Sequence, residues 1–240
     1  MDTLDELLFA RTPNALHPLM GVTVLLVEDS RYACEAVRLL CQKSGARLRR
    51  AGSIAHAKLH LRTYRPRVVI IDLGLPDGNG ESLIRELARA PQRVDVILGF
   101  SGDLDGWMRS ISAGADGYLA KPVDSLGGFQ HAILSQLPAA ERPRGPRPMP
   151  EGDISPDRLA LTDDLTLAAD ALRSSDDDRL GYVAQFLGSV ASSADDPALF
   201  RAVSELAALH TQRKPVKEQV RHLTRMVQER IEGARRTGLH

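Results

Sequence analysis

Acidic residues stand directly after two apolar runs of the chain. Glu28 and Asp29 follow the run TVLLV at residues 23–27, and Asp72 ends the run VVIID at residues 68–72. Neighbouring carboxylates repel one another unless a proton or a cation lies between them. An oxygen-only cluster suits a hard cation such as Mg²⁺, which takes one or two carboxylates together with waters and phosphate oxygens. The chemistry that these residues indicate is therefore the binding of a divalent cation.

A hydroxyl and an amine follow two further apolar runs. Ser101 comes after VDVILGF at residues 94–100, and Lys121 comes after GYLA at residues 117–120. Both side chains donate hydrogen bonds, and beside a cation they would suit the oxygens of a phosphoryl group. The four runs together indicate a site for a cation and a phosphoryl group.

The elements that must position these residues alternate between strand and helix patterns. The expected strands are residues 23–27, 47–51, 68–72, 94–100 and 117–120. The expected helices lie within residues 30–45, 53–65, 80–90, 102–115 and 124–137. Short strands that alternate with helices predict a parallel sheet covered on both faces. Sites in such sheets form outside the carboxyl ends of the strands, where the polar residues named above stand.

Four motifs in this order resemble a known family. LLVEDS, VVIIDLGLPDGNG, FSG and AGADGYLAKPV are similar to the receiver domain of two-component response regulators, over roughly residues 22–138. The resemblance implies a doubly wound α/β fold, with a five-stranded parallel sheet in the flavodoxin-like order 2-1-3-4-5. It also implies that Asp72 accepts a phosphoryl group from a phosphohistidine of a sensor histidine kinase or a phosphotransfer protein.

The resemblance assigns further roles around Asp72. The residues implied to bind Mg²⁺ are Asp29, Asp72 and, through its backbone carbonyl, Gly74, while Glu28 is implied to act mostly through a bound water. The residues implied to bind or sense the phosphoryl group are Ser101, Lys121 and Tyr118. The Lys121–Pro122 peptide bond is expected to be cis. Such a domain promotes its own phosphoryl transfer and dephosphorylation, and we expect no separate catalytic output domain.

The composition changes after the receiver-like segment. We expect an N-terminal extension at residues 1–21 with a short amphipathic helix at Leu4–Ala10, a receiver domain at 22–138 and a Pro-rich extended linker at 139–157. Residues 158–240 show four apolar stripes at helical spacing, which predict an all-α helical domain. Its breaks are polar and rich in Asp and Ser.

The function of the helical domain has three candidate readings. A partner-binding or homodimerisation module is favoured. DNA binding is disfavoured because the helices are long and the breaks lack the short turn of a helix-turn-helix. A phosphotransfer bundle is disfavoured because the sequence after His210 has a proline where that family has a glycine. The exposed face of the last helix should carry a basic ridge of Lys217, Arg221 and Arg225.

Composition restricts the remaining classes. The 31 lysine and arginine residues balance 31 acidic residues, so a globally basic nucleic-acid binder is not indicated. The two cysteines, Cys34 and Cys41, are expected to be reduced core residues. No apolar run approaches the ~18 residues of a membrane helix, and the N-terminal segment lacks a long apolar region. We therefore expect a cytoplasmic protein with no membrane partner.

Overall fold

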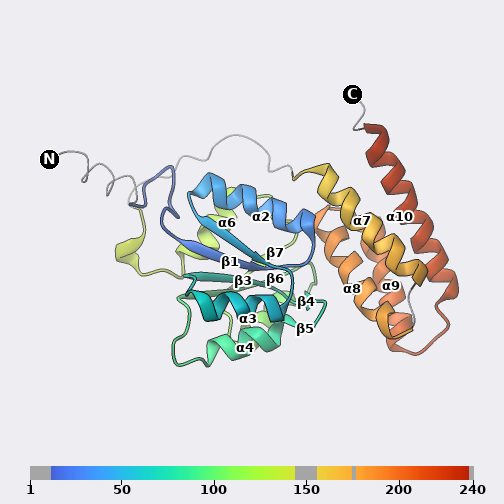
Figure 1. Ribbon diagram of the computed structural model, residues 1–240, viewed down its shortest axis with the longest axis horizontal. Coiled ribbons are helices and arrows are strands. Elements are labelled where there is room, and N and C mark those ends of the chain that lie inside the picture. Colours follow the sequence, from blue (N-terminus) through green and yellow to red (C-terminus); the bar gives the residue numbers. More distant parts are fainter. Residues whose placement is uncertain (1–11, 144–155, 175–176, 238–240) are drawn as a thin grey trace.

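The computed structural model describes residues 12–143, 156–174 and 177–237 of the chain. Within these residues the chain forms a sheet with helices on both faces, followed by a bundle of helices that lies at one end of the sheet (Figure 1). The helix expected at Leu4–Ala10 and most of the Pro-rich linker lie outside the described residues.

A parallel sheet forms the centre of the first domain. Its strands are β1 (Thr23–Val27), β2 (Arg47–Ala51), β3 (Val68–Asp72), β6 (Val96–Ser101) and β7 (Gly117–Ala120). Their order is β2-β1-β3-β6-β7, and every neighbouring pair is parallel. This is the order 2-1-3-4-5 of the five expected strands, so the predicted fold class is confirmed. The chain reverses its direction across the sheet between β1 and β3, and a site is expected at the carboxyl ends of these two strands.

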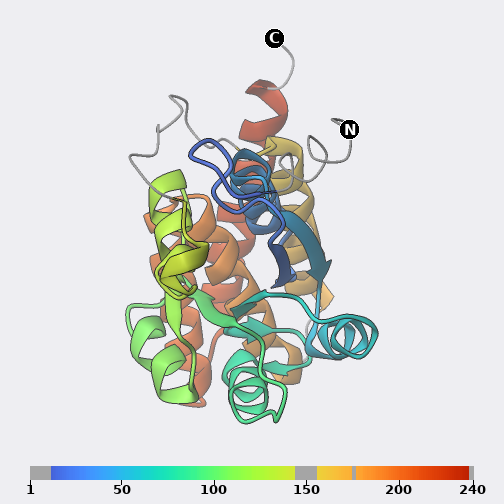
Figure 2. The same cartoon turned by 90° about the vertical axis from the view of Figure 1, so that its left-hand side faces the viewer.

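Helices cover both faces of the sheet. They are α2 (Arg31–Ser44), α3 (Ile54–Thr63), α4 (Gly80–Ala88), α5 (Gly106–Ala113) and α6 (Leu126–Leu134). Successive residues of a strand point to opposite faces. Val24 and Leu26 pack in a core with α2 and α6, whereas Leu25 and Val27 pack in a second core with α3, α4 and α5. Figure 2 shows these helix layers on the two sides of the sheet.

A short hairpin follows β3, around the turn-favouring sequence Pro76-Asp77-Gly78. Its strands are β4 (Gly74–Leu75) and β5 (Gly78–Asn79), which pair in antiparallel fashion. Gly78 has a φ of 151°, which a side chain would make unfavourable. The Asp77 carboxylate at its tip accepts hydrogen bonds from Ile54 N and Ala55 N, both at 2.8 Å. The hairpin thereby caps α3 across the surface.

The described residues of the second domain are helical, as predicted. The helices are α7 (Arg158–Ser174), α8 (Asp177–Ser193), α9 (Pro197–Thr211) and α10 (Lys217–Thr237). The predicted apolar stripes meet in one core, whose members include Leu165, Leu172, Leu187, Val190, Leu206, Leu223 and Val227. None of the helices in the part of the chain that the structure describes is long and apolar enough to cross a membrane.

The two domains pack directly against each other. Helix α7 contacts α2, and α8 contacts both α2 and β4. Figure 1 shows α7 and α8 on the side of the bundle that faces the sheet. The first residues of the expected linker form a short 3₁₀ turn, Ala139–Glu141, and Glu141 forms an ion pair with Arg67 of the first domain at 2.6 Å.

Candidate functional site

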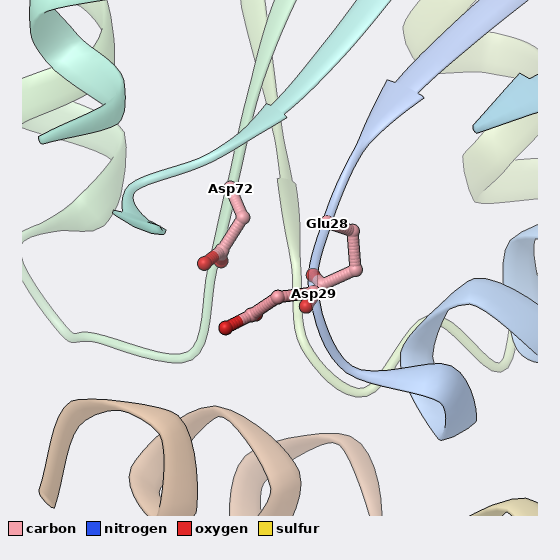
Figure 3. Close-up of side chains that lie close together, drawn as sticks. All are labelled: Glu28, Asp29 and Asp72. Carbon is pink, nitrogen blue, oxygen red and sulfur yellow. The ribbon is translucent and has the colours of Figure 1, made fainter. Parts of the chain in front are cut away.

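The carboxyl ends of the strands bring the predicted acidic residues together. Glu28 and Asp29 follow β1, and Asp72 is the last residue of the neighbouring strand β3. One carboxylate oxygen from each of the three lies within 4.8 Å of the others. Figure 3 shows the three side chains converging from two strand ends. The predicted cluster therefore exists, and it forms because the two strands that carry it are parallel neighbours.

Lys121 joins this cluster from the end of β7. Its Nζ donates hydrogen bonds to Glu28 Oε2 at 2.6 Å and to Asp72 Oδ1 at 2.7 Å, and its side chain is fully buried. The same Nζ lies 4.4 Å from the centre of the Phe100 ring. Burial acts to lower the pKa of Lys121, but the charges of Asp72 and Glu28 outweigh it and raise that pKa. Lys121 therefore stays charged as the counter-ion of the cluster.

Burial raises the pKa of two carboxyl groups of the cluster, whereas on Lys121 it acts to lower the pKa. It raises the pKa of Glu28 well above its ordinary value, and the attraction of Lys121 offsets this only in part. It also raises the pKa of Asp29, and the charge of Asp72 adds to the effect. A carboxyl group that resists ionisation in this way is stabilised as a carboxylate when a cation binds beside it.

The donor set fits a hard divalent cation. The three carboxylates exceed the single lysine charge, and the Oδ1 atom of Asp29 is buried with no hydrogen-bond partner among the described residues. Unpaired buried oxygens of this kind call for a missing partner such as an ion. The oxygen-only character of the cluster matches the ligands that Mg²⁺ prefers. Glu28, Asp29 and Asp72 are the residues that would hold it.

Gly74 lies beside Asp72, as the prediction requires. The Gly74 N–H donates a hydrogen bond to Asp72 Oδ2 at 2.9 Å. This contact holds the second oxygen of Asp72 while Lys121 holds the first. The role of the Gly74 carbonyl as a cation ligand stays a prediction.

The remaining predicted residues lie along the ends of β6 and β7. Ser101 is buried, and its Oγ accepts a hydrogen bond from Asp103 N at 3.1 Å. Tyr118 donates its hydroxyl hydrogen bond to the Ser101 carbonyl at 2.6 Å. Burial raises the pKa of Tyr118 to about 12, so its hydroxyl stays protonated as a donor. The Lys121–Pro122 peptide bond is cis, as the resemblance implies.

The helical domain supplies residues that the sequence analysis did not identify. Tyr182 of α8 donates a hydrogen bond to Asp29 Oδ2 at 2.8 Å. Ser189 of the same helix accepts a third hydrogen bond from Lys121 Nζ, at 2.6 Å. These partners are 153 and 68 residues from the groups that they contact. No local motif marks them, because only the docking of the two domains brings them to the site.

Asp164 of α7 holds the loop next to the cluster. Its carboxylate accepts hydrogen bonds from Ser30 Oγ at 2.8 Å, Arg31 N at 3.1 Å and Tyr32 N at 3.0 Å. Two of these donors are orphan N–H groups of the first turn of α2, where a negative charge is favourable. The aspartate from the second domain therefore caps a helix of the first.

A cavity of about 250 Å³ remains between the domains beside Asp72. On the receiver-like side its lining includes Asp72 and Ser101, and on the other side it includes Ser189 and the small residues Gly181, Ala184 and Gly188. Asp72 itself is only 2% exposed. The site is thus covered by α8 but not filled by it.

Comparison with known proteins assigns the first domain. The family model of the response regulator receiver domain matches residues 24–130. The KDP operon transcriptional regulatory protein KdpE of Escherichia coli is 30% identical over 138 residues, which is 57% of this chain and 61% of the relative. The photosynthetic apparatus regulatory protein RegA of Cereibacter sphaeroides is 30% identical over 139 residues, 57% of this chain and 71% of the relative.

A solved structure is similar over the same part. It is the receiver domain of a sensor histidine kinase from Pseudomonas aeruginosa, with a magnesium ion coordinated in its active site cleft. Its sequence identity is 25% and its TM-score 0.44, covering 48% of this chain and 97% of that one. The chain spans about three fifths of the length of KdpE, and the family model does not extend into the helical domain. Through residues 24–130, the chain belongs to the response regulator family.

Proposed function

We propose that this response regulator accepts a phosphoryl group on Asp72 in a reaction that needs Mg²⁺. The observation that carries the proposal is the buried bridge of Lys121 Nζ between Glu28 and Asp72, within a cluster of three carboxylates. A phosphorylated Asp72 would carry additional negative charge in this buried place. A fixed cation next to the acceptor offsets such charge before the reaction begins.

In the phosphoryl transfer the protein supplies the nucleophilic carboxylate, and its other residues only position groups and offset charge. A carboxylate oxygen of Asp72 attacks the phosphorus of a phosphohistidine, the P–N bond breaks, and the imidazole leaves and takes up a proton. Lys121 lies 2.7 Å from Asp72 and would hold one of the oxygens of the transferred group. Ser101 would hold another. Mg²⁺, when bound, would supply charge neutralisation for the phosphoryl oxygens.

The donor is proposed to be a sensor histidine kinase or a phosphotransfer protein. Asp72 is 2% exposed and Lys121 is 6% exposed. Helix α8 lies over both, since its Ser189 bonds Lys121 and it lines the cavity beside Asp72. An imidazole carried by another protein can reach Asp72 only after α8 has moved away. We therefore infer that phosphoryl transfer from a protein donor is coupled to displacement of the helical domain.

The output is proposed to pass through that helical domain by partner binding or dimerisation. In this structure its helices α7 and α8 contact the receiver domain, which we call the closed arrangement. Displacement would expose them to a partner or to a second copy. DNA binding remains a second candidate, since Lys217, Arg221 and Arg225 are all exposed on α10.

Phosphorylation of the full chain by acetyl phosphate with Mg²⁺ tests the proposal. The intact mass should rise by one phosphoryl group, and the gain should disappear in base. Asp72→Asn should gain none, whereas Asp77→Asn, which changes an exposed aspartate on the nearby hairpin, should react like the unchanged protein. Full labelling of Asp72→Asn would reject Asp72 as the acceptor.

A further inference from the structure

The loop that carries Asp29 is held by the helical domain at that residue and at the three residues that follow it. The Tyr182 hydroxyl donates to Asp29 Oδ2 at 2.8 Å. Immediately afterwards in the chain, the Asp164 carboxylate accepts three hydrogen bonds from the residues that begin α2. Two helices of the second domain thus fix both the direction of the Asp29 carboxylate and the backbone next to it.

Asp29 is left with one oxygen to offer. Tyr182 occupies Oδ2, while Oδ1 is buried and has no hydrogen-bond partner among the described residues. Asp29 offers a ligand atom within 4.8 Å of those of Glu28 and Asp72. Figure 3 shows the Asp29 side chain reaching toward the space between Asp72 and the pale orange helices of the second domain. Leaving a buried oxygen unpaired costs free energy until a partner arrives.

We propose that the helical domain completes the cation site. In this arrangement Tyr182 is the positioning residue that orients the Asp29 carboxylate, while Asp164 fixes the loop that carries Asp29. Hydrogen bonds from outside the ligand set orient ligating carboxylates, and their loss weakens metal binding. The proposal rests on the proposed function, in which Asp29 is a ligand of Mg²⁺. It adds that the ligand is set in place by a domain outside the receiver fold.

In the alternative arrangement the Tyr182 hydroxyl is an inhibitor of cation binding, because it competes with the cation for the Asp29 carboxylate. The two arrangements predict opposite signs. Removing the hydroxyl weakens cation binding if Tyr182 positions Asp29, and strengthens it if Tyr182 competes. The single hydrogen bond to Oδ2, with Oδ1 left open, favours positioning.

Linkage gives the proposal a consequence for the domains. If docking of α8 strengthens cation binding, then cation binding strengthens docking of α8 by the same factor. Mg²⁺ would therefore favour the closed arrangement, which a protein donor must open.

The test is Mg²⁺ binding to the full-length protein, measured by isothermal titration calorimetry. Tyr182→Phe should raise the Kd for Mg²⁺ about tenfold or more, since loss of such an orienting partner typically costs 10–100-fold in metal affinity. Asp164→Asn should also weaken binding, because it removes charge from the cap that holds the loop. Circular dichroism and urea titration without Mg²⁺ show that each variant is folded.

Two matched controls separate positioning from general loosening. Tyr64→Phe removes a hydroxyl that bonds His60 on α3, away from the site. Asp163→Asn breaks an exposed ion pair with Arg31 across the same domain interface without touching Asp29. Both should leave the Kd within about twofold, because neither reaches the cluster and exposed pairs contribute little.

Several results would overturn the proposal. These are an unchanged or lower Kd in Tyr182→Phe, or an equal weakening in Asp163→Asn. If Tyr182→Phe does not fold, an unchanged Kd in Asp164→Asn overturns it instead. Labelling at Asp72 together with Tyr182-independent Mg²⁺ binding defeats this inference alone. Tyr182-dependent Mg²⁺ binding without any labelling defeats the proposed function alone.

Discussion

Replacing Lys121 by methionine should destabilise the protein strongly when no divalent cation is present. Lys121 has a fully buried side chain and donates to Glu28, Asp72 and Ser189. Methionine keeps much of the length of the side chain and its apolar contacts but removes the charge. The change leaves the three clustered carboxylates without their counter-ion in a buried place.

The expected cost follows from that arrangement. Removing one partner of a buried ion pair typically costs about 3–5 kcal/mol, because the remaining charge is left uncompensated. Lys58→Met provides the matched control, since Lys58 pairs with Glu86 at 2.7 Å but both side chains are about half exposed. That variant should lose about 1 kcal/mol or less. The contrast isolates burial from ion pairing as such.

The free energy of unfolding that Lys121→Met loses should be larger at neutral pH than at acidic pH. The pKa values of Glu28 and Asp29 are raised in the folded protein above their ordinary values of 4.5 and 3.8. The folded state therefore binds more protons than the unfolded state above those values, and its stability falls as pH rises through that range. Without Lys121 the pKa of Glu28 rises further, so the fall is steeper in the variant. The difference between variant and unchanged protein should narrow as pH falls toward 4.5.

Urea unfolding, followed by circular dichroism in the presence of a chelator at neutral and at acidic pH, measures both effects. The reasoning is refuted if Lys121→Met loses no more free energy of unfolding at neutral pH than Lys58→Met. It is also refuted if the loss is the same at both pH values. Added Mg²⁺ should recover part of the stability of the variant, because a ligand that binds only the folded state stabilises it.

Three further predictions concern parts of the chain away from the cluster. Asp77→Ala should lower the free energy of unfolding by about 1 kcal/mol, since its carboxylate caps two N–H groups of α3, and a loss within error would show that the cap contributes nothing. Asp196 caps α9 and pairs with Arg230, which lowers the pKa of Asp196. Asp196→Ala should therefore be less stable than the unchanged protein at pH above 3.8, the ordinary pKa of aspartate, and this difference should disappear as pH falls further. Urea titrations at neutral and low pH decide this, and a loss that persists at low pH contradicts it. Charge reversal to glutamate at three exposed positions of α10 should leave the helical content unchanged. Neither this triple variant nor the unchanged protein should bind random duplex DNA at physiological salt in an anisotropy titration. These positions are Lys217, Arg221 and Arg225. Sub-micromolar duplex binding that the triple change abolishes would favour a DNA-binding output.

The sheet and the cluster could be predicted because short-range patterns encode them. Continuous apolar runs such as VVIID mark buried parallel strands, and a polar residue at the end of each run marks the edge where sites form. Asp72 and Lys121 are 49 residues apart, yet both follow from the same rule. Regular secondary structure therefore determined which groups meet within the first domain.

The contacts between the domains could not be predicted in this way. Tyr182 and Ser189 lie on α8 among apolar residues, and nothing in their spacing relates them to Asp29 or Lys121. Their partners are set by how one finished domain docks on another, which helical periodicity does not describe. Asp77 illustrates the same limit: turn chemistry explains its place in the hairpin, but its capping of α3 depends on tertiary structure.

The assignment of Asp72 as the phosphoryl acceptor is tested by locating the phosphoryl group within the chain. The full-length protein is incubated with acetyl phosphate and Mg²⁺, and the acyl phosphate is then trapped by reduction with sodium borohydride, which converts the modified aspartate to homoserine. Peptide mass mapping identifies the reduced residue. Homoserine is expected at position 72 and at no other aspartate. Reduction at Asp29, or at any residue other than Asp72, would rule out Asp72 as the sole acceptor.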